Sequence, residues 1–363
     1  MADLSVKICG LSFAAPLMPA AGPPVRDGAA CVAAVKGGAA AIVSKTISVE
    51  PAQVPRPCMA DVQIGMLNTE LWSELPKEQW LAKEYAIAKS AGVPLIIGLG
   101  YTAEQIRELA PLVRPFADAL ELSCHYIGND LKPITDTVRT AKESVDVPVF
   151  VKMSPHPNIQ EIALAVEAAG ADALVMINSF GPCMGIDVET GLPHMGSQTG
   201  YGWLSGRAIK ALAVRCIFDA ARVVKIPIFG VGGVASGRDA AELLMAGASA
   251  VQICTEAILK GPSVYGKIAG ELNDFLDSHG YAAVRDIIGL TVRKMRDRSV
   301  RTFAVPPVVD PARCIGCGNC VRSCPYQAVR LQEKVAVIDS VECFGCGLCI
   351  SRCPVQAIGF PKA

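Results

Sequence analysis

Short apolar stretches alternate with longer amphipathic stretches between residue 16 and about residue 280. Apolar runs of this length are typical of strands that are buried on both faces of a parallel sheet. Eight strands are predicted, at Leu17–Ala21, Ala40–Ser44, Leu95–Leu99, Ala119–Leu122, Val149–Lys152, Ala173–Ile177, Ile226–Gly230 and Ala250–Cys254. Helices are predicted between them, for example over Gln79–Ala91, Ala103–Phe116, Ile159–Ala169, Arg207–Val223 and Arg238–Ala246. Eight βα units in roughly 250 residues favour an α/β fold of the (β/α)₈ TIM-barrel type over a doubly wound open sheet, which normally has fewer parallel strands.

Two connections are too long for ordinary loops between a strand and the next helix. They span residues 46–77 and 178–204, and both follow the C-terminal end of a predicted strand. Barrel enzymes keep their active sites at that end of the strands, and long loops there usually shape or cover a ligand. The site is therefore expected beside these two connections.

The C-terminal part of the chain contains the pattern C-x₂-C-x₂-C-x₃-C-P twice, at 314–325 and at 343–354. In two-cluster ferredoxins, three cysteines of each run hold one [4Fe–4S] cluster and the fourth ligates the other. One predicted ligand set is Cys314, Cys317, Cys320 and Cys353, and the other is Cys343, Cys346, Cys349 and Cys324. Structural zinc and disulfides are alternatives, but the doubled spacing with both prolines favours a small α+β, bacterial-type ferredoxin domain with two clusters. The predicted division is a barrel at 1–301, a proline-rich linker at 302–312 and the ferredoxin domain at 313–363.

Charge and cysteine usage narrow the functional class. The 34 basic and 34 acidic residues balance, which argues against binding to nucleic acid or to a membrane surface. No apolar run approaches the ~20 residues that span a bilayer, and the chain opens without a signal peptide. The seven cysteines outside the two runs show no secreted-scaffold spacing. These features are typical of a protein in a reducing cytoplasm.

The last two predicted strands end in residues suited to a phosphate group. Gly232 and Gly233 follow the seventh strand, and Thr255 follows the eighth. Glycines before a helix start let backbone N–H groups approach an anion. The segment 230–235 also fits a dinucleotide-binding pattern, but it belongs to the seventh unit and does not open a separate βαβαβ half. A barrel phosphate site is therefore the preferred interpretation.

Two lysines and one cysteine at strand ends are candidates for chemistry. Lys45 and Lys152 would be costly inside an apolar barrel without an anionic partner. A flavin is one such partner, because a cation near its N1 tunes it; a carboxylate such as Glu70 or Glu121 is the alternative. Cys124 is the best acid/base candidate, since a thiol is mostly protonated at neutral pH. Its alternative role is that of a small buried apolar residue.

With these residues in place, the chain resembles a known family. It is similar to the class-1 dihydroorotate dehydrogenases, and more closely to the C-terminal half of dihydropyrimidine dehydrogenase, where an FMN barrel precedes a two-cluster ferredoxin domain. The resemblance covers almost the whole chain. It is carried by Lys45-Thr46, Leu67–Leu71, Ser123-Cys124, Lys152–Pro155, Asn178-Ser179, Tyr201–Gly206, Gly232-Gly233 and Cys254-Thr255.

The resemblance implies a flavoenzyme that exchanges a hydride between FMN N5 and a ring carbon, while Cys124 handles the proton. It implies that Lys45 and Lys152 contact the flavin ring. The further residues implied to bind FMN are Ala20, Thr46, Gly206, Gly232, Gly233, Cys254 and Thr255. The residues implied at the substrate are Asn68, Glu70, Glu121, Ser123, Asn178 and Ser179. Amides and hydroxyls suit a planar heterocycle with alternating donors and acceptors.

The end of the fourth strand departs from the family pattern. Glu121 replaces an asparagine, and His125-Tyr126 replaces the start of a proline-led loop. An ionised carboxylate only accepts hydrogen bonds, so it would repel orotate and suit an N–H-rich or cationic ring. The sequence therefore predicts an oxidoreductase acting on a CH–CH bond of a pyrimidine-like ring in pyrimidine metabolism, with the same chemistry on a non-pyrimidine ring as an alternative. An electron-transfer subunit without its own substrate, and a flavin-free phosphate-binding barrel, are further alternatives.

The electrons need a partner, because no second fingerprint for FAD or NAD(P)H occurs in the chain. The expected partner is an NAD(P)H-oxidising FAD flavoprotein subunit or a soluble ferredoxin. The protein is therefore expected to form a homo- or hetero-oligomer.

Overall fold

The computed structural model describes residues 1–124, 128 and 130–361. The chain divides into two compact units, a barrel unit at Met1–Arg296 and a C-terminal unit at Asp297–Ala363. They are described separately below.

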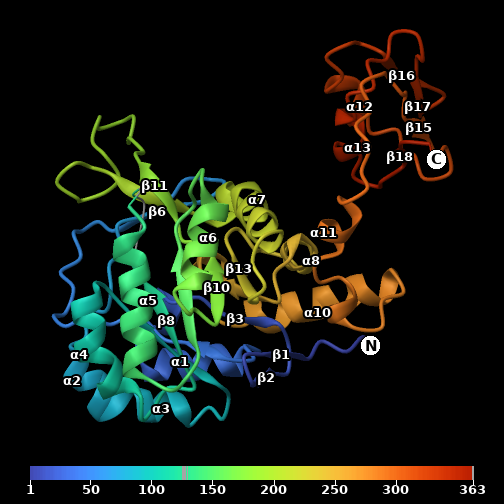
Figure 1. Cartoon of the computed structure of the whole chain (residues 1–363). Coiled ribbons are helices and arrows are strands. Elements are labelled where there is room, and N and C mark those ends of the chain that lie inside the picture. The colour runs from blue at the N-terminus through green and yellow to red at the C-terminus, as the bar shows by residue number, and fades with distance from the viewer. Residues whose placement is uncertain (125–127, 129, 362–363) are drawn as a thin grey trace. The chain divides into compact units, whose positions relative to one another are not determined.

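Eight parallel strands form the centre of the barrel unit (Figure 1). Their order in the sheet is β3 (Leu17–Pro19), β14 (Ala250–Ile253), β13 (Ile228–Val231), β10 (Ala173–Met176), β9 (Val149–Met153), β8 (Ala119–Ser123), β7 (Leu95–Leu99) and β4 (Ile42–Val43). The backbone N–H of Ala40 donates to the carbonyl of Leu17 at 2.9 Å, which brings the two ends of the sheet together. The predicted (β/α)₈ barrel is confirmed. The strand bounds agree for β7 and differ elsewhere by one or two residues at an end.

Helices cover the outside of the strands (Figure 1). They are α1 (Gly28–Lys36), α2 (Lys77–Gln79), α3 (Tyr85–Lys89), α4 (Ala103–Val113), α5 (Lys132–Ser144), α6 (Ile159–Ala168), α7 (Lys210–Ala221), α8 (Gly237–Ala246), α9 (Thr255–Lys260), α10 (Val264–Ser278) and α11 (Leu290–Lys294). Several begin at side-chain caps, as at Ser236, whose hydroxyl accepts from the Asp239 N–H before α8. None of the helices that the structure describes is long and apolar enough to cross a membrane.

An N-terminal hairpin contributes to the interior of the barrel. Its strands are β1 (Val6–Ile8) and β2 (Leu11–Phe13). Phe13 packs edge-on against Phe229 of β13 at 6.4 Å, and Phe229 lies 4.9 Å from Phe150 of β9. All three rings are buried. The barrel interior is therefore filled by side chains here, and the strand ends that carry the predicted site residues are left for a ligand.

The two long connections pair with each other, which the sequence did not predict. Residues from the first form β5 (Met59–Asp61) and β6 (Met66–Asn68), and residues from the second form β11 (Phe180–Cys183) and β12 (Gly202–Ser205). They make one antiparallel sheet in the order β11-β12-β6-β5. The two connections are therefore one structural element.

The C-terminal unit consists of short strands and helices. They are β15 (Val308–Val309), α12 (Asn319–Arg322), β16 (Val329–Gln332), β17 (Val335–Ile338), α13 (Leu348–Ser351) and β18 (Ile358–Gly359). β15 pairs with β18, and β16 pairs with β17. The predicted α+β ferredoxin-type domain is confirmed. The segment predicted as a linker, 302–312, contains β15, which pairs with β18 of this unit.

Candidate active site

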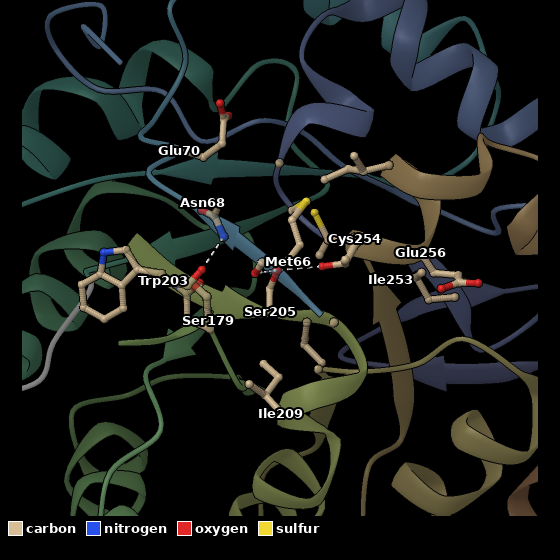
Figure 2. Close-up of a pocket in the computed structure, with 18 of the residues that line it drawn as sticks. Met66, Asn68, Glu70, Ser179, Trp203, Ser205, Ile209, Ile253, Cys254 and Glu256 are labelled. Carbon is tan, nitrogen blue, oxygen red and sulfur yellow. Dashed lines mark hydrogen bonds between the residues drawn. The ribbon is translucent and has the colours of Figure 1, made fainter. Parts of the chain in front are cut away.

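A cavity of about 760 Å³ lies at the C-terminal ends of the barrel strands. Its wall includes residues from the strand ends and from the antiparallel sheet of the two long connections, among them Met66, Asn68, Trp203 and Ser205 (Figure 2). Ligand sites usually range over roughly 300–1,000 Å³. The cavity is thus large enough for a flavin mononucleotide with part of a substrate.

The residues predicted to bind FMN all line this cavity. They are Ala20, Lys45, Thr46, Lys152, Gly206, Gly232, Gly233, Cys254 and Thr255. They come from six different strand ends and loops, far apart in the sequence. The structure thus brings together the whole predicted set in one place.

The end of the cavity beside β13 and β14 presents backbone rather than side chains. Gly206, Gly232 and Gly233 have φ angles of 76°, 123° and 77°, which L side chains rarely adopt. A Cβ at Gly233 would lie 2.5 Å from Cβ of Lys210, so even alanine has no room there. The Thr255 hydroxyl donates to Ser205 Oγ at 2.9 Å, and Ser205 Oγ donates to the Met66 carbonyl at 3.2 Å (Figure 2). Close backbone approach beside the start of α8 fits a phosphate group.

Each of the two lysines pairs with a carboxylate. Lys45 Nζ lies 2.7 Å from Glu70 Oε2, and Lys152 Nζ lies 3.4 Å from Glu121 Oε1. The lysine side chains are only 8% and 6% exposed, yet both line the cavity. The structure therefore shows the carboxylate partners that the sequence left as an alternative. A ligand in the cavity would meet lysines whose charges are already balanced.

Glu121 lies beneath the cavity and does not line it. Its side chain is 0% exposed, and its Oε2 accepts a 2.6 Å hydrogen bond from Gln252 Nε2. The expected contact between Glu121 and a substrate is corrected by this placement, since Lys152 and Gln252 stand between Glu121 and the cavity. The preference for an N–H-rich or cationic ring, which was argued from Glu121, loses its basis.

Cys124 also lies outside the cavity wall. It packs against the core between the barrel and its helices, with Thr137 of α5 beside its thiol. Burial raises the pKa of this thiol to about 12, and Thr137 opposes the shift only partly. Cys124 is thus a protonated thiol held away from the cavity in this conformation. The departures at His125 and Tyr126 lie outside the described residues.

The remaining predicted substrate residues line the cavity. They are Asn68, Glu70, Ser123, Asn178 and Ser179. The Asn68 amide donates to the Trp203 carbonyl at 3.0 Å, across the pairing of β6 with β12 (Figure 2). That bond fixes the amide, so its oxygen is available to a ligand.

Several lining residues were not predicted from the sequence. Trp72 and Tyr101 meet edge-to-face at 4.9 Å, and both line the cavity together with Trp203. Gln252 of β14 also lines it, and its buried Oε1 has no hydrogen-bond partner among the described atoms. The signal that could have found Trp72 and Trp203 is their position within the two long connections.

The C-terminal unit contains a small cavity lined by cysteines from both runs. They are Cys314, Cys317, Cys320 and Cys353. The backbone N–H of Ala336 points at Cys314 Sγ at 3.5 Å, and that of Ala357 points at Cys353 Sγ at 3.2 Å. This is the set predicted for one cluster, with the crossing ligand included. Within the described ranges, no group of three or more His, Cys, Asp or Glu side chains is already arranged to hold a metal ion.

Comparisons with known proteins agree with this architecture. A family model described as dihydroorotate dehydrogenase matches residues 3–276, and one described as a 4Fe-4S dicluster domain matches residues 307–360. The chain is similar to the catalytic subunit of dihydroorotate dehydrogenase B (NAD(+)) from Methanothermobacter thermautotrophicus, with 37% identity over 300 residues that cover 79% of this chain and 98% of the relative. The same subunit from Pyrococcus horikoshii is 35% identical over 304 residues, covering 80% and 98%. That from Thermoplasma acidophilum is 35% identical over 306 residues, covering 81% and 100%. These relatives support the dihydroorotate dehydrogenase side of the resemblance, and they do not carry the closer likeness to dihydropyrimidine dehydrogenase.

Proposed function

Because the chain belongs to the dihydroorotate dehydrogenase family, we propose that it is an iron–sulfur flavoenzyme that reduces or oxidises a C–C bond in a pyrimidine-like ring. One observation carries this proposal. All nine residues implied to bind FMN line a single cavity of about 760 Å³. A barrel that had lost its ligand would have no reason to keep this set together.

FMN, when bound, supplies hydride exchange at its N5 atom. The chain supplies the rest. The backbone at Gly232 and Gly233 would hold the phosphate of FMN, and Lys45 and Lys152, which also line the cavity, would lie beside its ring. Reduction of one C=C bond takes two electrons and two protons, so a hydride to one carbon requires an acid that protonates the other.

Cys124 is the proposed acid. Its raised pKa of about 12 keeps the thiol protonated at neutral pH, which suits a proton donor. The thiol lies beside Thr137 here, so substrate binding has to bring Cys124 and the ring together. Catalytic contacts commonly form only once substrate is bound.

The substrate we propose is a planar ring with several N–H and C=O groups. The amides of Asn68 and Asn178 and the hydroxyls of Ser123 and Ser179 offer both donors and acceptors around the cavity. The relatives are named for dihydroorotate. A dihydropyrimidine dehydrogenase-like specificity, for a ring without a carboxylate, is the finer form of the proposal.

Electrons would reach the barrel through two [4Fe–4S] clusters in the C-terminal unit. The cysteine cavity supports the ligand set Cys314, Cys317, Cys320 and Cys353, and the second set follows by the same spacing. The relatives are named as catalytic subunits of an NAD(+) enzyme, which supports an electron-transfer partner such as an NAD(P)H-oxidising FAD subunit or a ferredoxin.

The test is to photoreduce the purified protein without oxygen and add candidate ring compounds, while the flavin absorbance is followed. We expect rapid reoxidation by at least one pyrimidine. The visible spectrum after cluster extraction is the first control, since a protein without flavin would contradict the proposal.

The placement of Cys124 favours a second candidate function, an electron-transfer subunit with no substrate of its own. Its thiol faces Thr137 instead of the cavity. In that case no ring compound would reoxidise the flavin, and a redox protein partner would do so rapidly.

A further inference from the structure

Glu121 is the strand residue at which this chain departs from the family it resembles, and it sits directly under the cavity floor. We propose that Glu121 is a positioning residue that neutralises Lys152 and thereby lowers the reduction potential of the flavin bound above it. The inference rests on the proposed flavin site and assigns a role to a residue outside that site.

Two side chains from other strands contact the carboxylate of Glu121. Oε1 lies 3.4 Å from Lys152 Nζ, and Oε2 accepts from Gln252 Nε2 at 2.6 Å. Oε2 is therefore hydrogen-bonded, whereas the buried Oε1 has no hydrogen-bond partner among the described atoms and meets Lys152 only as an ion pair. Lys152 comes from β9, the neighbour of β8, while Gln252 comes from β14, which is four strands away from β8 in the sheet order. These contacts hold the carboxylate across the interior of the barrel.

Burial makes this pair electrostatically strong. The side chains of Glu121 and Lys152 are 0% and 6% exposed, so water screens them little. Of the two, only Lys152 reaches the cavity wall. A ligand above the floor is therefore next to a cation whose charge is balanced from below.

A flavin responds to such a balance because its reduced form carries negative charge near N1. An unbalanced cation beside the ring favours the reduced form and raises the potential. The second lysine of the floor, Lys45, is balanced in the same way by Glu70 at 2.7 Å. A floor in which both lysines are compensated leaves the reduced flavin less stabilised. That makes it a stronger reductant, which suits delivery of electrons to a C=C bond.

Gln252 has a part in the same arrangement. Its amide nitrogen is used on Glu121, which turns Oε1 away from the carboxylate. That oxygen is buried and has no hydrogen-bond partner in the described part of the chain, and the residue lines the cavity. Gln252 Oε1 could therefore accept a hydrogen bond from an N–H group of the bound ligand, beside the lysine that Glu121 neutralises.

The test uses the full-length holoprotein and measures the flavin midpoint potential by anaerobic dye-coupled titration. We expect Glu121→Gln and Glu121→Asn to bind reduced flavin, relative to oxidised flavin, at least tenfold more tightly than the unaltered protein. For a two-electron couple, tenfold corresponds to an upward shift of about 30 mV. Lys152→Gln should shift the potential downward, and the double variant Glu121→Gln/Lys152→Gln should return close to the starting value.

Glu84→Gln is the matched control. Glu84 is a buried glutamate of the same unit that bonds the Gly28 N–H and lies outside the cavity wall. It should change stability without moving the potential. An unchanged potential in both Glu121 variants with normal flavin content would overturn the inference. So would loss of flavin from both variants while the far-ultraviolet circular dichroism stays native, because a neutralising role predicts retained binding. Absence of flavin from the unaltered protein would instead defeat the proposed function itself.

Discussion

The pH dependence of the reaction gives a direct test of the thiol at Cys124. Burial raises the pKa of this thiol from 9.0 to about 12. At pH 8 the thiolate fraction is then ~10⁻⁴, against ~10⁻¹ for a thiol at its ordinary value. The two directions of the reaction should respond oppositely, because reduction of a C=C bond needs the thiol and oxidation of the CH–CH bond needs the thiolate.

We expect the rate of ring reduction to stay flat from about pH 6 to about pH 11 and to fall above the pKa of Cys124. The rate of ring oxidation should rise about tenfold for each pH unit over the same range. Stopped-flow measurement of flavin absorbance under anaerobic conditions gives both rates. Cys124→Ala should slow both by roughly 10²–10⁴-fold and abolish these profiles.

Alkylation provides a measurement that is independent of turnover. Cys124 should react with iodoacetamide at pH 8 about 10³-fold more slowly than a thiol at its ordinary pKa, because reaction requires the thiolate. Cys183, partly exposed on β11, is the internal control in a mass-spectrometric time course. An apparent pKa near 9 in both reaction directions, with fast alkylation of Cys124, would refute the assignment of the reacting group to the Cys124 thiol in this environment.

Three further changes test the fold and the sites. Gly233→Ala places a Cβ 2.5 Å from a neighbouring side-chain carbon at a φ of 77°, so the amount of bound flavin measured by absorbance should fall below a tenth of normal. Gly92→Ala is the control, because Gly92 has a similar φ of 72° and open space around it, and this variant should keep a normal flavin content. Cys353→Ser and Cys314→Ser should each remove the same single cluster. Each variant should therefore lose about half of its iron and the same electron-paramagnetic-resonance signal. If the two variants lost different clusters, Cys353 would not be the fourth ligand of the cluster that Cys314 binds. Glu84→Ala removes a buried acceptor of the Gly28 N–H and should lower the free energy of unfolding by roughly 3 kcal/mol in urea titrations; a change below about 0.5 kcal/mol would show that water replaces the carboxylate.

The barrel could be predicted from the sequence because its strands are continuous apolar runs. Leu95–Leu99 is buried at every position and was predicted at its observed bounds. The antiparallel sheet was missed because its pairing is non-local: Trp203 pairs with Asn68, more than a hundred residues earlier. Its strands are three or four residues long and partly exposed, so their hydrophobic pattern is weak.

The sequence predicted which residues gather near the site better than it predicted how far each one lies from the cavity. Glu121 and Ser123 both belong to β8 and differ by one period of the strand, yet only Ser123 lines the cavity. Sequence spacing gives the face of a strand, but it does not say which layer of the barrel interior a side chain occupies. Cys124, one residue further, takes the opposite face and meets Thr137. The layer that each side chain occupies depends on how far neighbouring strands are staggered along the barrel axis, and local sequence does not encode that stagger.

The shared sheet of the two long connections has a consequence for engineering this scaffold. β6 lies between β5 and β12, and the Asn68 amide is tied to the backbone of Trp203. Transplanting one connection from a relative would break these ladder bonds and leave the other half without a partner. An engineered change of substrate specificity should therefore transfer both connections together. Natural sequence variation in one connection should likewise be accompanied by matching variation in the other.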